Sequence, residues 1–140
     1  MSKQGLKRGF LNRILGIPAT KTPIDSDCWA YSDGVLTVDL ARAPELSKPG
    51  GAMRLEGNGL PERVLVFQGD DGEFRAFKNR CSHIGHRRLD PVPGQNCVQC
   101  CSVNGSMFEY DGDNLKGPAP HPAKTYEVHK EGASLEIKLA

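Results

Sequence analysis

Cys81-Ser82-His83 and, further along the chain, Cys101-Ser102-Val103-Asn104-Gly105-Ser106 are two short motifs built from residue types that bind metal ions. Thiolates and imidazoles are the ligands that proteins offer to iron and zinc. Residues two apart in an extended chain share a face, so the side chains of Cys81 and His83 can point at one site. Cys100 and Cys101 are adjacent and face opposite sides of a strand, so only one of them can be a ligand without bending the chain. Cys101 keeps a two-residue spacer to Asn104 and the Gly105-Ser106 that follows, and Cys100 is then expected to pack into the sheet.

The length and composition indicate one small domain that is rich in turns. The chain has 140 residues, and its 16 glycines and 10 prolines suit short strands better than long helices. The formal net charge of +1 does not point to a nucleic acid or another polyanion as a partner. No apolar run reaches the ~18 residues that a transmembrane helix needs. The number of cysteines is odd, at 5, and most of them cluster, which favours metal binding over a disulfide framework.

Residues 1–24 are predicted to form a basic N-terminal segment attached to a domain that spans residues 25–140. Apolar residues recur in it at helical spacing and predict a short amphipathic helix that ends at Pro18. These residues are Leu6, Phe10, Ile14 and Ile17. One interpretation is a helix docked on its own domain or a partly ordered tail. Another is a docking surface for a partner protein, or peripheral contact of residues 1–17 with an acidic membrane.

A third interpretation of the N-terminal segment is export. Lys7-Arg8-Gly9-Phe10-Leu11 resembles a variant twin-arginine signal. The apolar stretch after the charged pair is interrupted by Asn12, Arg13 and Pro18, so it lacks the continuous hydrophobic region of an export signal. We therefore expect the protein to reside in the cytoplasm.

From residue 26 onward the sequence predicts short antiparallel strands. Their residue types alternate or are β-rich, and glycine-containing turns separate them, which is typical of an all-β barrel or sandwich. The predicted strands are 35–40, 63–67, 74–77, 98–100, 106–110, 126–129 and 135–138, with turns at 33–34, 69–72, 111–114 and 131–132. Residues 43–51 are predicted to be an excursion bounded by proline and glycine. Cys28 and Cys97 are expected to be structural.

A third segment, Gly117-Pro118-Ala119-Pro120, extends the two motifs into a family resemblance. From about residue 27 to residue 140 the chain resembles Rieske domains, which carry a Cys-x-His loop, a Cys-x-x-His-Gly loop and a covering proline loop. The resemblance implies an all-β, Rieske-like antiparallel β-sandwich or barrel, with a cluster-binding subdomain of two loops plus the Gly-Pro-Ala-Pro loop. It also implies a [2Fe–2S] cluster with Cys81, His83 and Cys101 among its ligands.

The chain departs from the family pattern at the fourth ligand, because Asn104 stands where the second histidine is expected. His86, three residues after His83, is our preferred replacement. Asn104 itself could bind iron through its amide oxygen, which is a hard and weak donor for this metal. Alternatively, a solvent molecule could be the fourth ligand. His121 after the proline loop, and Cys100 in a distorted loop, are the remaining candidates.

The resemblance also assigns residues around the cluster. Ser106 matches a serine whose hydroxyl bonds a cluster sulfur, whereas Phe108 replaces a tyrosine and has no donor, which implies a lower potential. The positions of the disulfide found in cytochrome bc complexes are His86 and Val103, so that bridge is absent. These differences resemble a soluble Rieske-type ferredoxin more than a quinol-oxidising subunit.

Three functions remain open from the sequence. The first is a one-electron carrier with atypical cluster ligation and a redox partner protein, acting as an electron-transfer component rather than a catalytic subunit. The second is a mononuclear zinc or iron site, and the third is a metal-free Rieske fold used for interaction or regulation. From the length of 140 residues we do not expect a complete Rieske oxygenase, which would need a second domain with a mononuclear iron site.

Overall fold

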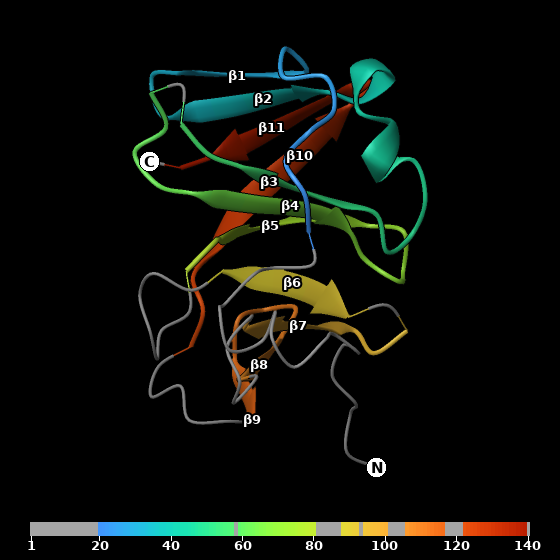
Figure 1. Ribbon diagram of the computed structural model, residues 1–140, viewed down its shortest axis with the longest axis vertical. Helices are drawn as coiled ribbons and strands as arrows, with labels where there is room; N and C mark the ends of the chain where they lie inside the picture. The colour runs from blue at the N-terminus through green and yellow to red at the C-terminus, as the bar shows by residue number, and fades with distance from the viewer. Residues whose placement is uncertain are drawn as a thin grey trace.

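The computed structural model describes residues 20–57, 59–80, 88–92, 94–100, 106–116 and 122–139, which form an almost entirely β structure. The large sheet has the strand order β1-β2-β11-β10-β5-β4-β3, and the small sheet has the order β6-β7-β8-β9. All strand pairs are antiparallel. In Figure 1 the small sheet lies at one end of the molecule, below the large one. The predicted all-β antiparallel fold is confirmed.

The large sheet contains β1 (Trp29–Ser32), β2 (Val35–Asp39), β3 (Ala52–Leu55), β4 (Val64–Gln68), β5 (Phe74–Lys78), β10 (Thr125–Glu131) and β11 (Ser134–Lys138). The small sheet contains β6 (Leu89–Val92), β7 (Cys97–Cys100), β8 (Met107–Glu109) and β9 (Asn114–Lys116). Two 3₁₀ turns, η1 (Leu40–Arg42) and η2 (Pro44–Leu46), lie between β2 and β3. Over the described ranges, no helix has the length and apolar character needed to cross a membrane.

The hairpin between β1 and β2 follows directly from its turn residues. Asp33 and Gly34 both have positive φ, at 50° and 81°. Positive φ at both central positions defines the type I′ turn, whose twist matches that of the flanking strands. Ser32 pairs with Val35, so the turn has two residues as predicted. Leu36 and Val38 are then buried while Thr37 is exposed, which is the alternation expected of a strand with one buried face.

Strand β4 separates two apolar cores. Val64 and Val66 pack into a core inside the large sheet, with Leu36, Leu135 and Ile137 among their neighbours. Leu65 and Phe67 point to the other side and pack against the small sheet. The second core also contains Phe77, Leu89, Val98, Cys100 and Phe108. Burial of both faces explains why β4 is a continuous apolar run rather than an alternating one.

Four strands lie outside the predicted ranges, namely β1, β3, β6 and β9. Strand β6 contains Pro91, which cannot donate a backbone hydrogen bond and argues against a strand. It is tolerated because β6 is an edge of the small sheet, where Pro91 lies opposite Val98. Strand β9 has only 3 residues and carries no clear alternation.

The end of the basic N-terminal segment packs on the domain. The Thr20 amide donates to Asp90 Oδ1 at 2.8 Å, and the Arg54 amide on β3 donates to the Lys21 carbonyl at 2.9 Å. The Ile24 amide donates to Glu45 Oε2 at 2.8 Å. Residues 1–19 lie outside the described residues, so the amphipathic helix and the division of the chain at residue 24 stay predictions.

We expect Gly112→Ala to destabilise the fold more than Gly72→Ala, although both glycines have positive φ, at 95° and 84°. A Cβ at Gly72 meets nothing within 4 Å, so that variant should lose about 1–2 kcal/mol through backbone strain alone. A Cβ at Gly112 would overlap the Ala123 carbonyl, which adds a clash with backbone. Urea unfolding followed by Trp29 fluorescence measures both losses, and equal losses would contradict the predicted clash.

Candidate metal centre

Three segments carry the predicted metal-binding motifs and the proline motif, namely residues 81–87, 101–105 and 117–121, and we call them the motif segments. The described residues next to each of them lie at one end of the small sheet. Leu89, which follows the Cys81 loop, pairs with Cys100 across β6 and β7. The Cys100 amide donates to the Ser106 carbonyl at 2.7 Å, so residues 101–105 begin and end side by side. Lys116, the last residue before the proline segment, pairs with Met107 across β8 and β9. The topology therefore brings the attachment points of the three segments together.

Most of the predicted ligands fall in those segments. Cys81, His83, His86, Cys101 and Asn104 lie outside the described residues, as do residues 117–121, so their ligation stays a prediction. Ser106 is described and is fully buried at the start of β8. A buried hydroxyl at this position fits the predicted bond to a cluster sulfur, which also stays a prediction.

The first motif segment is closed at its base by Asn79, which sequence reasoning missed. Asn79 is fully buried, and its backbone amide donates a hydrogen bond to the Arg63 carbonyl at 2.8 Å. Its Oδ1 accepts a hydrogen bond of 2.6 Å from the Leu89 amide, so one side chain joins the two ends of the segment. An asparagine two residues before Cys81 was the available signal, because asparagine side chains often bond nearby backbone in turns.

The second motif segment starts from a buried thiol. Cys100 has an exposed fraction of 0% and lies in the core between the sheets, with Val98 and Phe108. The prediction that Cys100 packs into the sheet is confirmed. Cys97 and Cys28 are also buried, at 0% and 1%, as predicted for structural cysteines. Burial raises the pKa of the Cys28 thiol.

Glu56 joins the far end of the first segment to the large sheet. Its carboxylate accepts hydrogen bonds from Arg54 Nη1 at 3.1 Å and from Arg88 Nη2 at 3.2 Å, with a further contact from Arg88 Nε. Burial raises the pKa of Glu56, but the bonds to Arg88 and Arg54 outweigh it and hold that pKa below its usual range. Arg54 Nε also donates to the Thr20 carbonyl at 3.0 Å. Arg88, the first described residue after the segment, is thus tied to β3 and the N-terminal chain.

Asp70 fixes the opposite end of the small sheet. Its carboxylate accepts from the amides of Gly94 and Asn96, at 2.9 and 3.1 Å, in the turn between β6 and β7. The hydroxyl of Tyr110 donates to Asp70 Oδ2 at 3.3 Å and accepts from the Asp70 amide at 3.1 Å. The Tyr110 ring lies 5.4 Å from Phe67 and 4.4 Å beneath the Arg75 guanidinium. The small sheet is therefore bonded to the large sheet at both ends.

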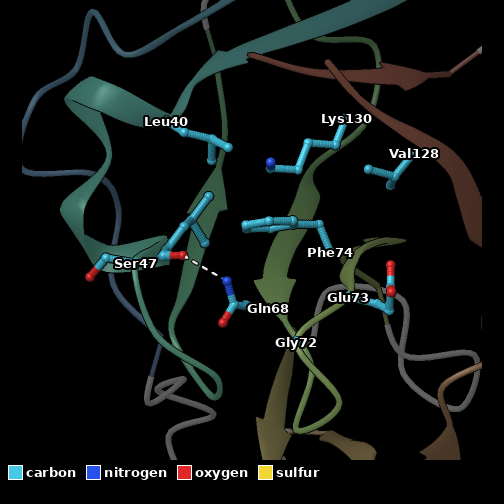
Figure 2. Close-up of a pocket in the computed structure, with 9 residues that line it drawn as sticks. Leu40, Ser47, Gln68, Gly72, Glu73, Phe74, Val128 and Lys130 are labelled. Atoms are coloured by element: carbon cyan, nitrogen blue, oxygen red, sulfur yellow. Dashed lines mark hydrogen bonds between the residues drawn. The ribbon is translucent and has the colours of Figure 1, made fainter. Parts of the chain in front are cut away.

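A pocket of about 490 Å³ is lined by residues of the large sheet and of the two 3₁₀ turns (Figure 2). In Figure 2 the Phe74 ring lies between Lys130 and Gln68. The side-chain amide of Gln68 donates a hydrogen bond to the Leu46 carbonyl at 3.4 Å. The pocket is lined by residues of η1, η2, β4, β5 and β10 and their turns, and none of its described lining residues belongs to β6–β9. Its described lining contains no cysteine or histidine.

Comparison with known proteins decides the family. A family model for the Rieske [2Fe-2S] domain matches residues 37–127. The chain belongs to the Rieske [2Fe–2S] domain family. The predicted family is confirmed, and the cofactor of that family is the [2Fe–2S] cluster, as predicted. The donor set at the motif positions fits such a cluster at Cys81, His83 and Cys101, and departs from it at Asn104.

Relatives and solved structures agree with this assignment. The cytochrome b6-f complex iron–sulfur subunit of Chlorobaculum thiosulfatiphilum is 26% identical, over 96% of this chain and 76% of that protein. The 3-phenylpropionate/cinnamic acid dioxygenase ferredoxin subunit of Escherichia coli (strain K12) is 30% identical, over 64% of this chain and 82% of that protein. The solved ferredoxin of carbazole 1,9a-dioxygenase from Nocardioides aromaticivorans IC177 superimposes with a TM-score of 0.59 at 21% identity. That match covers 74% of this chain and 98% of the ferredoxin, and it shows a shared fold.

We expect Asn79→Leu to open the base of the first segment. The variant leaves the buried Leu89 amide without its acceptor, which should cost about 1–3 kcal/mol. Hydrogen exchange followed by NMR should show the Leu89 amide losing protection, while the Cys100 amide, bonded to Ser106, keeps it. Equal loss at both amides would mean that Asn79 acts on global stability alone.

We expect Glu56→Gln to lower the free energy of unfolding by about 1 kcal/mol at pH 7. Because folding lowers the pKa of Glu56, its contribution is present above the usual pKa of 4.5 and is lost as the pH falls through the folded value. The difference between wild type and variant should therefore shrink below about pH 4.5. Urea unfolding at several pH values measures it, and a pH-independent difference would exclude the charge as its cause.

Proposed function

We propose that this protein is a one-electron carrier that binds a [2Fe–2S] cluster between the segments 81–87 and 101–105. The observation that supports it most is the convergence of the attachment points at Leu89, Cys100 and Ser106. Relatives are named as an iron–sulfur subunit and as ferredoxin subunits, which supports the same function for this chain. A redox partner protein must then supply or accept the electron.

The proposed ligands follow the family motif as far as it extends. Cys81 and Cys101 hold one iron, and His83 with His86 holds the other, which makes the ligation atypical because Asn104 replaces the usual histidine. The burial of Cys100 against Val98 and Phe108 counts against a third cysteine ligand. When bound, the cluster supplies a site that gains and loses one electron. Ser106 would stabilise the reduced form by donating its hydroxyl hydrogen to a sulfur.

The fold around this site serves to hold its ligands still. Asn79 closes the first segment and the bond between Cys100 and Ser106 closes the second, so neither base has to rearrange when the charge changes. Phe108, which the family resemblance matches to a tyrosine, is buried and adds no hydrogen-bond donor, which supports a comparatively low potential. The cytoplasmic location stays a sequence-based prediction.

The test is EPR spectroscopy of protein purified without oxygen and reduced with dithionite, with iron and zinc measured in the same sample. We expect two irons per chain and a reduced-cluster signal with the low average g value of mixed histidine and cysteine ligation. One zinc per chain and no signal would replace the proposal with a mononuclear site. No metal at all would leave a Rieske fold with another use.

Single substitutions identify the ligands in the same assay. Cys101→Ser should abolish the EPR signal, and Cys100→Ser should retain it. The reverse result would mean that Cys100, and not Cys101, is the ligand. His86→Ala should change the spectrum if His86 binds iron. Asn104→His should restore an ordinary Rieske spectrum, and an unchanged spectrum would mean that residue 104 does not face the cluster.

A further inference from the structure

A hollow of about 600 Å³ lies next to the base of the first motif segment. One wall is the connection between β3 and β4, including Pro61, Glu62 and Arg63. The other wall is formed by Asn79 and Arg80, where the chain leaves β5. Arg80 is covalently joined to Cys81, and consecutive Cα atoms are about 3.8 Å apart. A molecule seated in this hollow would therefore contact the residue that directly precedes the first proposed iron ligand.

Basic residues from three parts of the chain meet around this hollow. Lys78 pairs with Val64 across β4 and β5, and its amide donates to the Lys124 carbonyl at 2.8 Å. The Asn79 amide donates to the Arg63 carbonyl, also at 2.8 Å, and Arg80 follows. We name Arg63, Lys78, Arg80 and Lys124 the basic rim.

The basic rim concentrates positive charge in a chain whose net charge is only +1. Glu62 is the carboxylate that lines the hollow, and it forms an ion pair of 3.3 Å with Lys78. One carboxylate against the cations of the rim leaves the local charge positive. Such a surface attracts a negatively charged partner and orients it as it approaches.

One exposed hydrogen-bond donor group lines the hollow. The Arg80 side chain is exposed, and no described carboxylate pairs with it. Asn79, the residue before it, is fully buried, so its side chain does not take part in docking. The guanidinium of Arg80 can donate two parallel hydrogen bonds to the two oxygens of a carboxylate.

We propose that the basic rim is the docking surface for a redox partner with an acidic face, and that a partner carboxylate enters the hollow beside Arg80. This inference rests on the proposed function, because the electron must pass near Cys81 for docking there to serve electron transfer. The partner is identified by its chemistry, a protein surface rich in aspartate and glutamate.

The first experiment measures binding of fluorescein-labelled deca-glutamate to the full chain by fluorescence anisotropy. We expect binding that weakens with added salt, since screening acts on exposed charges. Arg80→Gln and Lys124→Gln should each weaken binding about fivefold or more. Lys130→Gln, which removes the same charge at the pocket of Figure 2, should leave it unchanged. Equal effects of Arg80→Gln and Lys130→Gln would overturn the proposal, because only net charge would matter.

The second experiment measures how fast the reduced protein passes its electron to hexacyanoferrate(III), an anion, and to tris(phenanthroline)cobalt(III), a cation. At low salt, Arg80→Gln should slow the reaction with the anion and not with the cation. Peptide binding that depends on Arg80 in a protein without an EPR signal would leave the docking surface standing and remove the proposed function. An EPR signal without Arg80-dependent binding would support the proposed function and overturn the docking surface.

Two further probes exclude other anions. Anionic phospholipid vesicles that bind with the same dependence on Arg80, when the peptide does not, would assign the rim to a membrane surface and overturn the proposal. Competition by millimolar sulfate as effective as by the peptide would reduce the hollow to a general anion site and would also overturn it.

Discussion

The packing of β4 against both cores is the constraint on which the metal centre depends. Leu65 and Phe67 contact the small sheet, while Val64 and Val66 contact the interior of the large one. The small sheet has strands of only 3 or 4 residues, which are too short to be stable alone. Its position, and with it the position of Leu89, Cys100 and Lys116, to which the motif segments are joined, is therefore set by apolar contact with β4 and β5.

Polar contacts then fix the orientation that apolar packing leaves free. Asp70 holds one end of the small sheet through two backbone amides and Tyr110, and Asn79 and Glu56 hold the end that carries the motifs. Hydrophobic contact is non-directional, whereas hydrogen bonds to fixed backbone groups specify one arrangement. A redox centre needs this specificity because its ligands must not rearrange when its charge changes.

The hairpins of the large sheet were predictable because their signals are local. Asp33-Gly34 specifies a two-residue turn, and the apolar run of β4 is visible without knowledge of its neighbours. Strand β6 was not predictable, since its proline fits only at a sheet edge. At the site, the family motif identified candidate ligands, but not the residues that hold them. Glu56 and Arg88 are separated by 32 positions and Asp70 and Asn96 by 26, and no short pattern records such contacts.

The unequal cores of the two sheets have a consequence for how the molecule opens. The large sheet encloses a core of its own, whereas the apolar residues of the small sheet are shared with β4 and β5 or form a minor cluster around Cys97. A cooperative unit that has few apolar contacts within itself opens at a lower free energy than the whole molecule. We therefore expect the small sheet to open at a lower free energy than the large sheet. Such opening would release Leu89, Cys100 and Lys116, to which the three motif segments are joined, before the large sheet unfolds.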